Sequence, residues 1–97
     1  MPFIKQDPRP FTETDILKLS KDQSGVYGIF KPNVWIYVGK GDIRDRLLQH
    51  IRGQDDNPCI LRNRPTFWVA EKISGDPSQR EKELILELTP ACNKRIG

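Results

Sequence analysis

The sequence is organised around one segment, GVYGIFKPNVWIYVG, which runs from Gly25 to Gly39. Its two halves are rich in β-branched and aromatic residues, which favour strands. Between them stands Pro32-Asn33, a pair typical of tight turns because proline presets its own φ and asparagine tolerates a left-handed backbone. We therefore predict a β-hairpin with strands over residues 25–31 and 34–39.

The register of this hairpin decides where its two tyrosines point. Residues that lie opposite each other in an antiparallel pair share one face of the sheet. A two-residue loop at Pro32-Asn33, which is the commoner kind, sends Tyr27 and Tyr37 to opposite faces. A three-residue loop or a bulge instead places both tyrosines on the same face.

An amphipathic helix is predicted directly after the hairpin. Ile43, Leu47 and Ile51 recur every four residues behind Asp42, which is a suitable N-cap, and a glycine ends the pattern. The charged and polar residues of this stretch, His50 among them, are assigned to its solvent-facing side. One apolar stripe thus predicts which face of the helix packs on the sheet.

Shorter signals complete the secondary structure. Three prolines in residues 1–11 predict an extended lead-in, and a short helix is expected between residues 12 and 20. Residues 54–65 are expected to form a loop with one helical turn near 59–62, and residues 66–73 a third strand. From Ser78, interpreted as an N-cap, a further helix runs to Pro90. The order predicts one α+β domain over residues 1–97, with a three-stranded antiparallel β-sheet flanked by helices.

Composition indicates one small, slightly basic, soluble domain. The chain has 97 residues, a mass of 11.2 kDa, a net charge of +3 and a mean hydropathy of −0.61. It is too apolar for a disordered tail, and no apolar run reaches the roughly 20 residues of a bilayer-spanning helix. We therefore expect a cytoplasmic protein with no membrane partner. The basic excess permits a polyanionic partner without identifying one.

The two cysteines, Cys59 and Cys92, stand alone in the sequence. There is no Cys-x-x-Cys pair and no cluster of histidines, so no zinc site is indicated. Since nothing in the sequence suggests an oxidising compartment, we predict that both are reduced thiols.

Three groups of residues could carry chemistry, and each has a structural alternative. Tyr27 and Tyr37 could simply be good strand formers. Arg46 and His50, four residues apart on a helix, could be ordinary solvated side chains. Glu81, in the first turn of a helix, could only complement the helix dipole. Individually, none of these residues identifies a site.

Together they resemble the GIY-YIG nuclease family. Gly25-Val26-Tyr27 and Tyr37-Val38-Gly39 are similar to the two motifs that name the family, with valine in place of isoleucine in both. The segment from Lys40 to Leu47 resembles the family's arginine-bearing helix. The likeness resumes in residues 81–93, where the order of the family is kept by Glu81, Leu84-Ile85, Pro90 and Asn93.

Two assignments within this resemblance have rivals. The family's arginine usually lies one residue further past its tyrosine than Arg46 does, so Arg44 competes with it. The apolar positions of the helix favour Arg46. Glu83 and Glu87 compete with Glu81, which the spacing to the following proline and asparagine favours.

The resemblance implies a metal-dependent endonuclease that hydrolyses phosphodiester bonds in DNA. Tyr27 would be the general base that activates water, Tyr37 would orient the water or its partner, and Arg46 would neutralise the phosphate. His50 would assist the leaving group or contact phosphate. Glu81 would be the only protein ligand of one Mg²⁺ or Mn²⁺ ion, which would keep most of its waters. Because a phenol with an ordinary pKa near 10 is a poor base, the site must favour its phenolate through neighbouring cations or the metal.

The resemblance also implies a nucleic-acid partner. Candidate contacts to backbone phosphates are the basic residues Lys40, Arg44, Arg52, Arg62 and Arg64. DNA, including branched or damaged DNA, is the expected partner, while RNA, a partner protein and a homodimer are left open. The alternatives from other classes are a non-catalytic nucleic-acid-binding module of the same fold and a small structural subunit.

Overall fold

The structure is a computed structural model that describes residues 3–93. Its regular elements, in chain order, are β1 (Arg9–Pro10), α1 (Glu13–Ile16), β2 (Ser24–Lys31), β3 (Val34–Asp42), α2 (Ile43–Ile51), α3 (Pro58–Arg62), β4 (Phe67–Lys72) and α4 (Ser78–Leu88). The predicted α+β class is confirmed. None of the helices within residues 3–93 is long and apolar enough to cross a bilayer.

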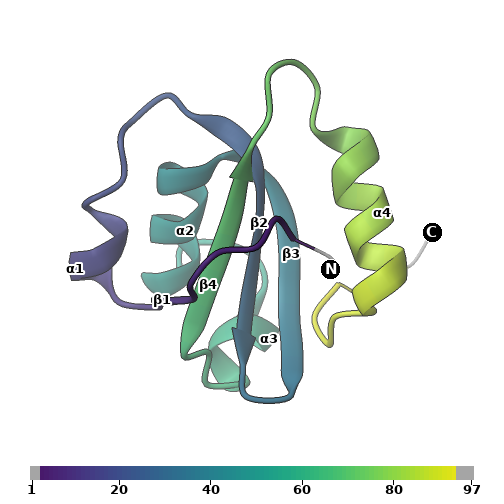
Figure 1. The fold of residues 1–97 in the computed structure, drawn as a ribbon. Helices are drawn as coiled ribbons and strands as arrows, with labels where there is room; N and C mark the ends of the chain where they lie inside the picture. Colours follow the sequence, from purple (N-terminus) through teal and green to yellow (C-terminus); the bar gives the residue numbers. More distant parts are fainter. Residues whose placement is uncertain (1–2, 94–97) are drawn as a thin grey trace.

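The strands form one antiparallel sheet in the order β1-β4-β2-β3 (Figure 1), so the hairpin supplies a central strand and one edge. The predicted three strands omit β1, in which Arg9 and Pro10 pair with Trp68 and Phe67 of β4. Two residues are too few for a periodic pattern, so the prolines of this segment indicated only an extended chain. Pro10 lies on the outermost strand, where a missing N–H is tolerated.

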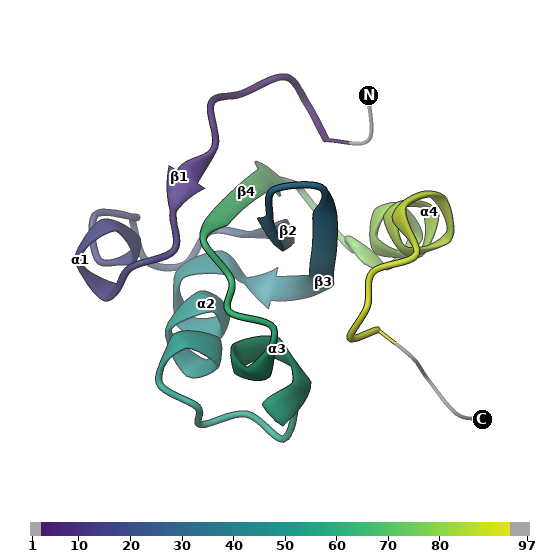
Figure 2. The ribbon, with the colours of Figure 1, turned by 90° about the horizontal axis from the view of Figure 1, so that it is seen from below.

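Helices cover the two faces of the sheet unequally. α1, α2 and α3 lie on one face, whereas α4 lies beside the edge strand β3 on the other side (Figure 2). One core contains Tyr27 and Leu47 under α2, and the other contains Val26, Val38 and Leu84 under α4. Because side chains alternate along a strand, the hairpin contributes to both cores. β3 therefore runs between α2 and α4.

A β-bulge sets the register of the hairpin. The turn has two residues, and its asparagine adopts a left-handed backbone with φ 67°. The register then shifts by one residue at Ile36 of β3, so that Tyr27 pairs with Gly39. Tyr27 thus lies diagonal to Tyr37 on the same face, as the bulged alternative requires.

The two long helices begin differently from each other. Asp42 caps α2 as predicted, because its carboxylate accepts a hydrogen bond from the backbone N–H of Asp45 at 3.0 Å. The prediction that Ser78 caps α4 is wrong. Asp76 accepts hydrogen bonds from both the N–H and the hydroxyl of Ser78, at 3.0 and 2.7 Å, so the aspartate holds the start of this helix.

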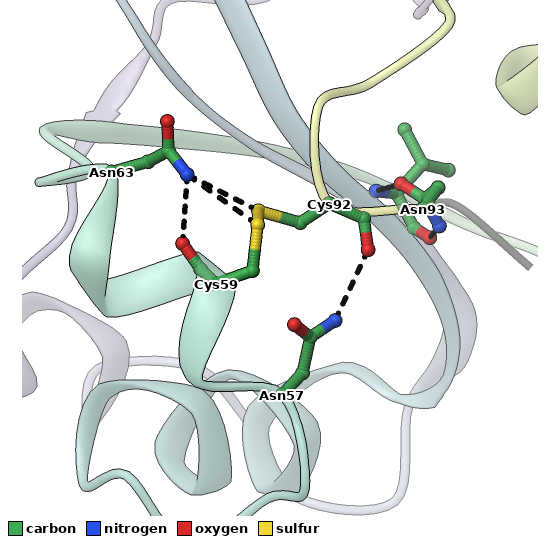
Figure 3. The surroundings of a disulfide bond; sticks show 6 residues. Asn57, Cys59, Asn63, Cys92 and Asn93 are labelled. Carbon is green, nitrogen blue, oxygen red and sulfur yellow. Dashed lines mark hydrogen bonds between the residues drawn. A yellow bond between two sulfur atoms is a disulfide. The ribbon is translucent and has the colours of Figure 1, made fainter.

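A disulfide joins Cys59 of α3 to Cys92, which follows α4, and the prediction of two reduced thiols is wrong. The residues are 33 positions apart in the sequence, and the fold brings their Cα atoms within 5.7 Å. Figure 3 shows that Asn57 and Asn63 flank the bridge, donating to the Cys92 and Cys59 carbonyls at 3.2 and 2.8 Å. The bridge therefore links α3 to the segment that borders β3.

Candidate active site

Tyr27 and Tyr37 approach each other on the face of the sheet that α2 covers. Their ring centroids are 6.3 Å apart, and Tyr27 is fully buried whereas Tyr37 is half-buried. Gly39 makes room for Tyr27, because a Cβ atom at this position would lie 2.3 Å from the phenol oxygen. The close approach of a phenol thus requires the glycine that ends the segment Tyr37-Val38-Gly39.

A chain of hydrogen bonds runs from Tyr27 through His50 to Asp55. The Tyr27 hydroxyl lies 2.7 Å from His50 Nε2, and His50 Nδ1 is hydrogen-bonded to Asp55 Oδ2. His50 is only 2% exposed, so its assignment to the solvent-facing side of α2 is wrong. Both ring nitrogens have partners from other segments, which makes burial of the imidazole possible. Asp55 is not among the site residues predicted from the sequence, where its one signal is its position in the loop just after this helix.

Arg46 lies between two cavities, of about 640 and 490 Å³, and lines both together with Tyr37. The first cavity also includes His50 and Asp55 in its wall, and the second includes Lys40 and Glu81. Arg46 Nη1 donates to Gln49 Oε1 at 3.2 Å, whereas its buried Nε has no acceptor within residues 3–93. A guanidinium with an unused donor is well suited to phosphate oxygens.

Glu81 belongs to α4 and lines the second cavity. α4 lies on the other side of the edge strand β3 from α2. The Glu81 Oε1 atom lies 4.0 Å from Lys40 Nζ, which also donates to Ser78 Oγ at 2.6 Å. The Glu81 side chain is 22% exposed, so a hydrated ion can approach it. Within the described residues no group of three or more His, Cys, Asp or Glu side chains could hold a metal ion. A single carboxylate fits one hard divalent ion that keeps most of its waters, such as Mg²⁺.

Asn93 fastens the segment after α4 to β3. Its Nδ2 atom donates to the Val38 carbonyl at 2.8 Å, and its Oδ1 atom accepts from the Val38 N–H at 2.7 Å. The N–H of Cys92 donates to the Ile36 carbonyl at 2.8 Å. The backbone on both sides of Tyr37 is therefore held from the outer edge of the sheet.

No protein-family model matches the chain, and no curated protein matches it. Solved structures of the GIY-YIG N-terminal endonuclease domain of UvrC from Thermotoga maritima do match. Two of these structures are point mutants of that domain bound to its catalytic divalent cation. One mutant has phenylalanine for a tyrosine and is 23% identical to this chain, and the other has alanine for an asparagine and is 22% identical. Both have a TM-score of 0.69, and each match covers 82% of this chain and 96% of that domain. The chain has the GIY-YIG fold.

The fold brings most of the predicted site residues together and leaves others apart. The side chains that line the two cavities include those of Tyr37, Lys40, Arg46, His50 and Glu81. Tyr27 lines neither cavity but is in contact with His50, which lines the first. Of the two rival arginines only Arg46 lines the cavities, and of the three glutamates only Glu81 does. Among the predicted phosphate contacts, the residues that line neither cavity are Arg44, Arg52, Arg62 and Arg64. Arg52 Nε instead donates to Glu13 of α1 at 2.9 Å.

Burial controls the ionisation of Tyr27 and His50 inside the site. Burial raises the pKa of the Tyr27 hydroxyl above its usual value, and the charge of Tyr37 adds to this, while the Arg46 guanidinium acts the other way. Burial lowers the pKa of His50, against the hydrogen bond and charge of Asp55. Of the two expected sources of a Tyr27 phenolate, neighbouring cations and a metal ion, the cations by themselves do not offset the burial of the phenol. At neutral pH the site instead pairs a protonated phenol with a neutral imidazole.

Proposed function

We propose that this chain is a divalent-ion-dependent endonuclease that hydrolyses phosphodiester bonds in DNA. The proposal is carried by the convergence of a phenol–imidazole pair, a guanidinium and a carboxylate around the edge strand β3. These groups come from β2, α2 and α4, so no local sequence requirement gathers them. The likeness in fold to UvrC endonuclease domains bound to a catalytic divalent cation supports the same proposal.

Arg46 and Lys40 are proposed to bind the scissile phosphate. A phosphodiester is anionic, so cations near its non-bridging oxygens stabilise the charge that builds up during attack. Arg46 offers a fork of donors with Nε unused, and Lys40 offers a point charge in the same cavity. Tyr27 lines neither cavity, whereas Arg46 lines both. We therefore expect Arg46 to turn toward the phosphate and so open a path for water to Tyr27.

Glu81 is the residue that would hold the divalent ion. When bound, such an ion stabilises negative charge on the phosphoryl and leaving oxygens. Lys40 lies close enough to the Glu81 carboxylate to orient it toward the second cavity. Tyr37, which lines both cavities, would position the attacking water between the phosphate and Tyr27.

Tyr27 and His50 are proposed to remove the proton from that water. The water oxygen bonds to phosphorus while one of its protons passes to the Tyr27 oxygen. The proton of the Tyr27 hydroxyl moves at the same time to His50 Nε2, along the hydrogen bond in which the oxygen and nitrogen are 2.7 Å apart. The bond from phosphorus to the leaving oxygen breaks, and the leaving oxygen takes a proton from solvent. This transfer avoids a free phenolate, which burial disfavours. It replaces the leaving-group role expected for His50, because both ring nitrogens are already engaged.

Cleavage assays test the proposal directly. Purified protein is incubated with supercoiled, linear and branched DNA, and with RNA, in the presence of Mg²⁺ or Mn²⁺. Glu81→Gln and Arg46→Ala should each lower the rate of nicking by about 100-fold or more. Glu87→Gln makes the same charge change on the same helix but outside both cavities, so this variant should retain nicking.

Three outcomes separate the alternatives. Metal-dependent nicking that is lost in the Glu81 and Arg46 variants and kept in the Glu87 variant supports the nuclease. Salt-sensitive DNA binding without nicking under any divalent ion favours a non-catalytic binding module instead. The absence of both binding and nicking would leave a structural role.

A further inference from the structure

Asp55 holds the buried imidazole of His50 from the side opposite Tyr27. Its side chain lies in the loop after α2 and is 13% exposed, whereas the His50 side chain is 2% exposed. Asp55 Oδ2 is hydrogen-bonded to His50 Nδ1, and Tyr27 Oη is 2.7 Å from His50 Nε2. The imidazole is thus fixed at both nitrogens, between a carboxylate and a phenol.

The chemistry of these three groups selects one tautomer. An ionised carboxylate can accept a hydrogen bond but cannot donate one, so the proton of a neutral imidazole beside it belongs on Nδ1. Nε2 is then an acceptor, and the Tyr27 hydroxyl donates to it. With the proton on Nε2 instead, the imidazole would donate to Tyr27 and could not take its proton.

We propose that Asp55 is a positioning residue that keeps His50 in the Nδ1–H tautomer, so that His50 Nε2 receives the phenol proton of Tyr27. The effect of Asp55 on the rate of DNA cleavage rests on the proposed nuclease function. The assignment of the His50 tautomer does not depend on that function. During the transfer the O–H bond of Tyr27 breaks as the N–H bond at His50 Nε2 forms. The Tyr27 oxygen takes a proton from the attacking water at the same time, and the imidazolium later releases its extra proton to solvent.

Asp55 also stabilises the cation that this transfer creates. The titratable groups that face His50 are Tyr27 from β2, Tyr37 from β3, Arg46 from its own helix and Asp55 from the following loop. Arg46 opposes a positive charge on the imidazole, and Asp55 acts in the opposite direction. Removing the Asp55 charge should therefore make His50 both wrongly protonated and a weaker base.

Nitrogen NMR of the imidazole tests the tautomer without DNA or metal. His50 is the only histidine in the chain, so its two ring-nitrogen signals need no assignment by mutation. The wild-type protein at neutral pH should show a protonated Nδ1 and an unprotonated Nε2. Tyr27→Phe should keep this pattern, because Asp55 rather than the phenol decides it. A protonated Nε2 in the wild-type protein, or loss of the pattern in Tyr27→Phe, would overturn the proposal.

Asp55→Asn is the decisive variant. Its amide can donate to Nδ1, so the proton should move to Nε2 and the pKa of His50, followed by NMR titration, should fall below that of the wild-type protein. Asp45→Asn removes the same charge from the exposed first turn of α2 and should change neither readout. A folded Asp55→Asn protein that retains the Nδ1–H tautomer would refute the assignment.

Single-turnover nicking then separates the two proposals. If the chain cleaves DNA, Asp55→Asn should reduce the rate by about 10-fold to 100-fold or more, the range for the loss of a residue that orients a functional histidine. A full rate in that variant would overturn the role of Asp55 in the proton transfer. If the wild-type protein cleaves nothing while the tautomer results hold, the nuclease proposal fails and the structural assignment of Asp55 stands.

Discussion

Gly39→Ala should disrupt the site by displacing the side chain of Tyr27, which packs against this glycine of β3. The new Cβ atom would lie 2.3 Å from the Tyr27 oxygen and 2.8 Å from Tyr37 Cε2, where ordinary contacts begin at 3.4 Å. Tyr27 must therefore move by about 1 Å to reach an ordinary contact distance. A shift of that size displaces the phenol oxygen from its 2.7 Å hydrogen bond with His50 and disrupts that bond.

The expected energy follows from these two changes. Overpacking a core costs about 1–3 kcal/mol, and the lost hydrogen bond adds about 1 kcal/mol. Gly39→Ala should therefore lower the free energy of unfolding by about 2–4 kcal/mol and leave a folded protein. Urea denaturation followed by tryptophan fluorescence measures the loss, and the His50 nitrogen signals report the broken contact.

A double-mutant cycle isolates the clash from other effects of the added methyl group. Tyr27→Leu removes both the phenol oxygen and the ring carbon that Gly39→Ala would strike. The double variant should therefore be more stable than the sum of the two single changes predicts, by about 1 kcal/mol or more. Additive effects, or a Gly39→Ala protein as stable as the wild type, would refute the packing argument.

Three other perturbations have expected outcomes. Asn93→Asp leaves the Val38 carbonyl without its hydrogen-bond donor, so it should lower the free energy of unfolding by about 1–3 kcal/mol. An unchanged midpoint of urea denaturation would contradict the hydrogen bond between Asn93 and Val38. Reduction of the bridge between Cys59 and Cys92, which are 33 residues apart, should lower the free energy of unfolding by about 3–4 kcal/mol. Urea denaturation with and without a thiol reductant measures this loss, and the stability of Cys59→Ser should not change with the reductant. The pKa of His50 lies below its usual 6.5 in the folded state, so the unfolded state binds more protons just below that pH. Stability should therefore fall as the pH drops below 6.5, and His50→Gln should show a smaller fall.

Local patterns predicted those parts of the fold that local interactions produce. The two strands of the hairpin, the turn between them and the Asp42 cap of α2 depend on residues within a few positions of each other. The same reasoning failed at Ser78, because a hydroxyl can donate as well as accept and Asp76 takes both of its donors. β1 was missed because only its pairing with β4 makes it a strand.

The sequence alone therefore determined which chemical groups are available, namely two phenols, a guanidinium, an imidazole and a carboxylate spaced along a hairpin and two helices. Only the tertiary structure decided how they meet. The bulge at Ile36 brings the phenols to one face, the burial of His50 depends on Asp55, and the Cys59–Cys92 bridge joins distant segments. The physical reason is that hydrogen bonds and packing act over a few ångströms of space, whereas periodicity and spacing report only neighbours along the chain.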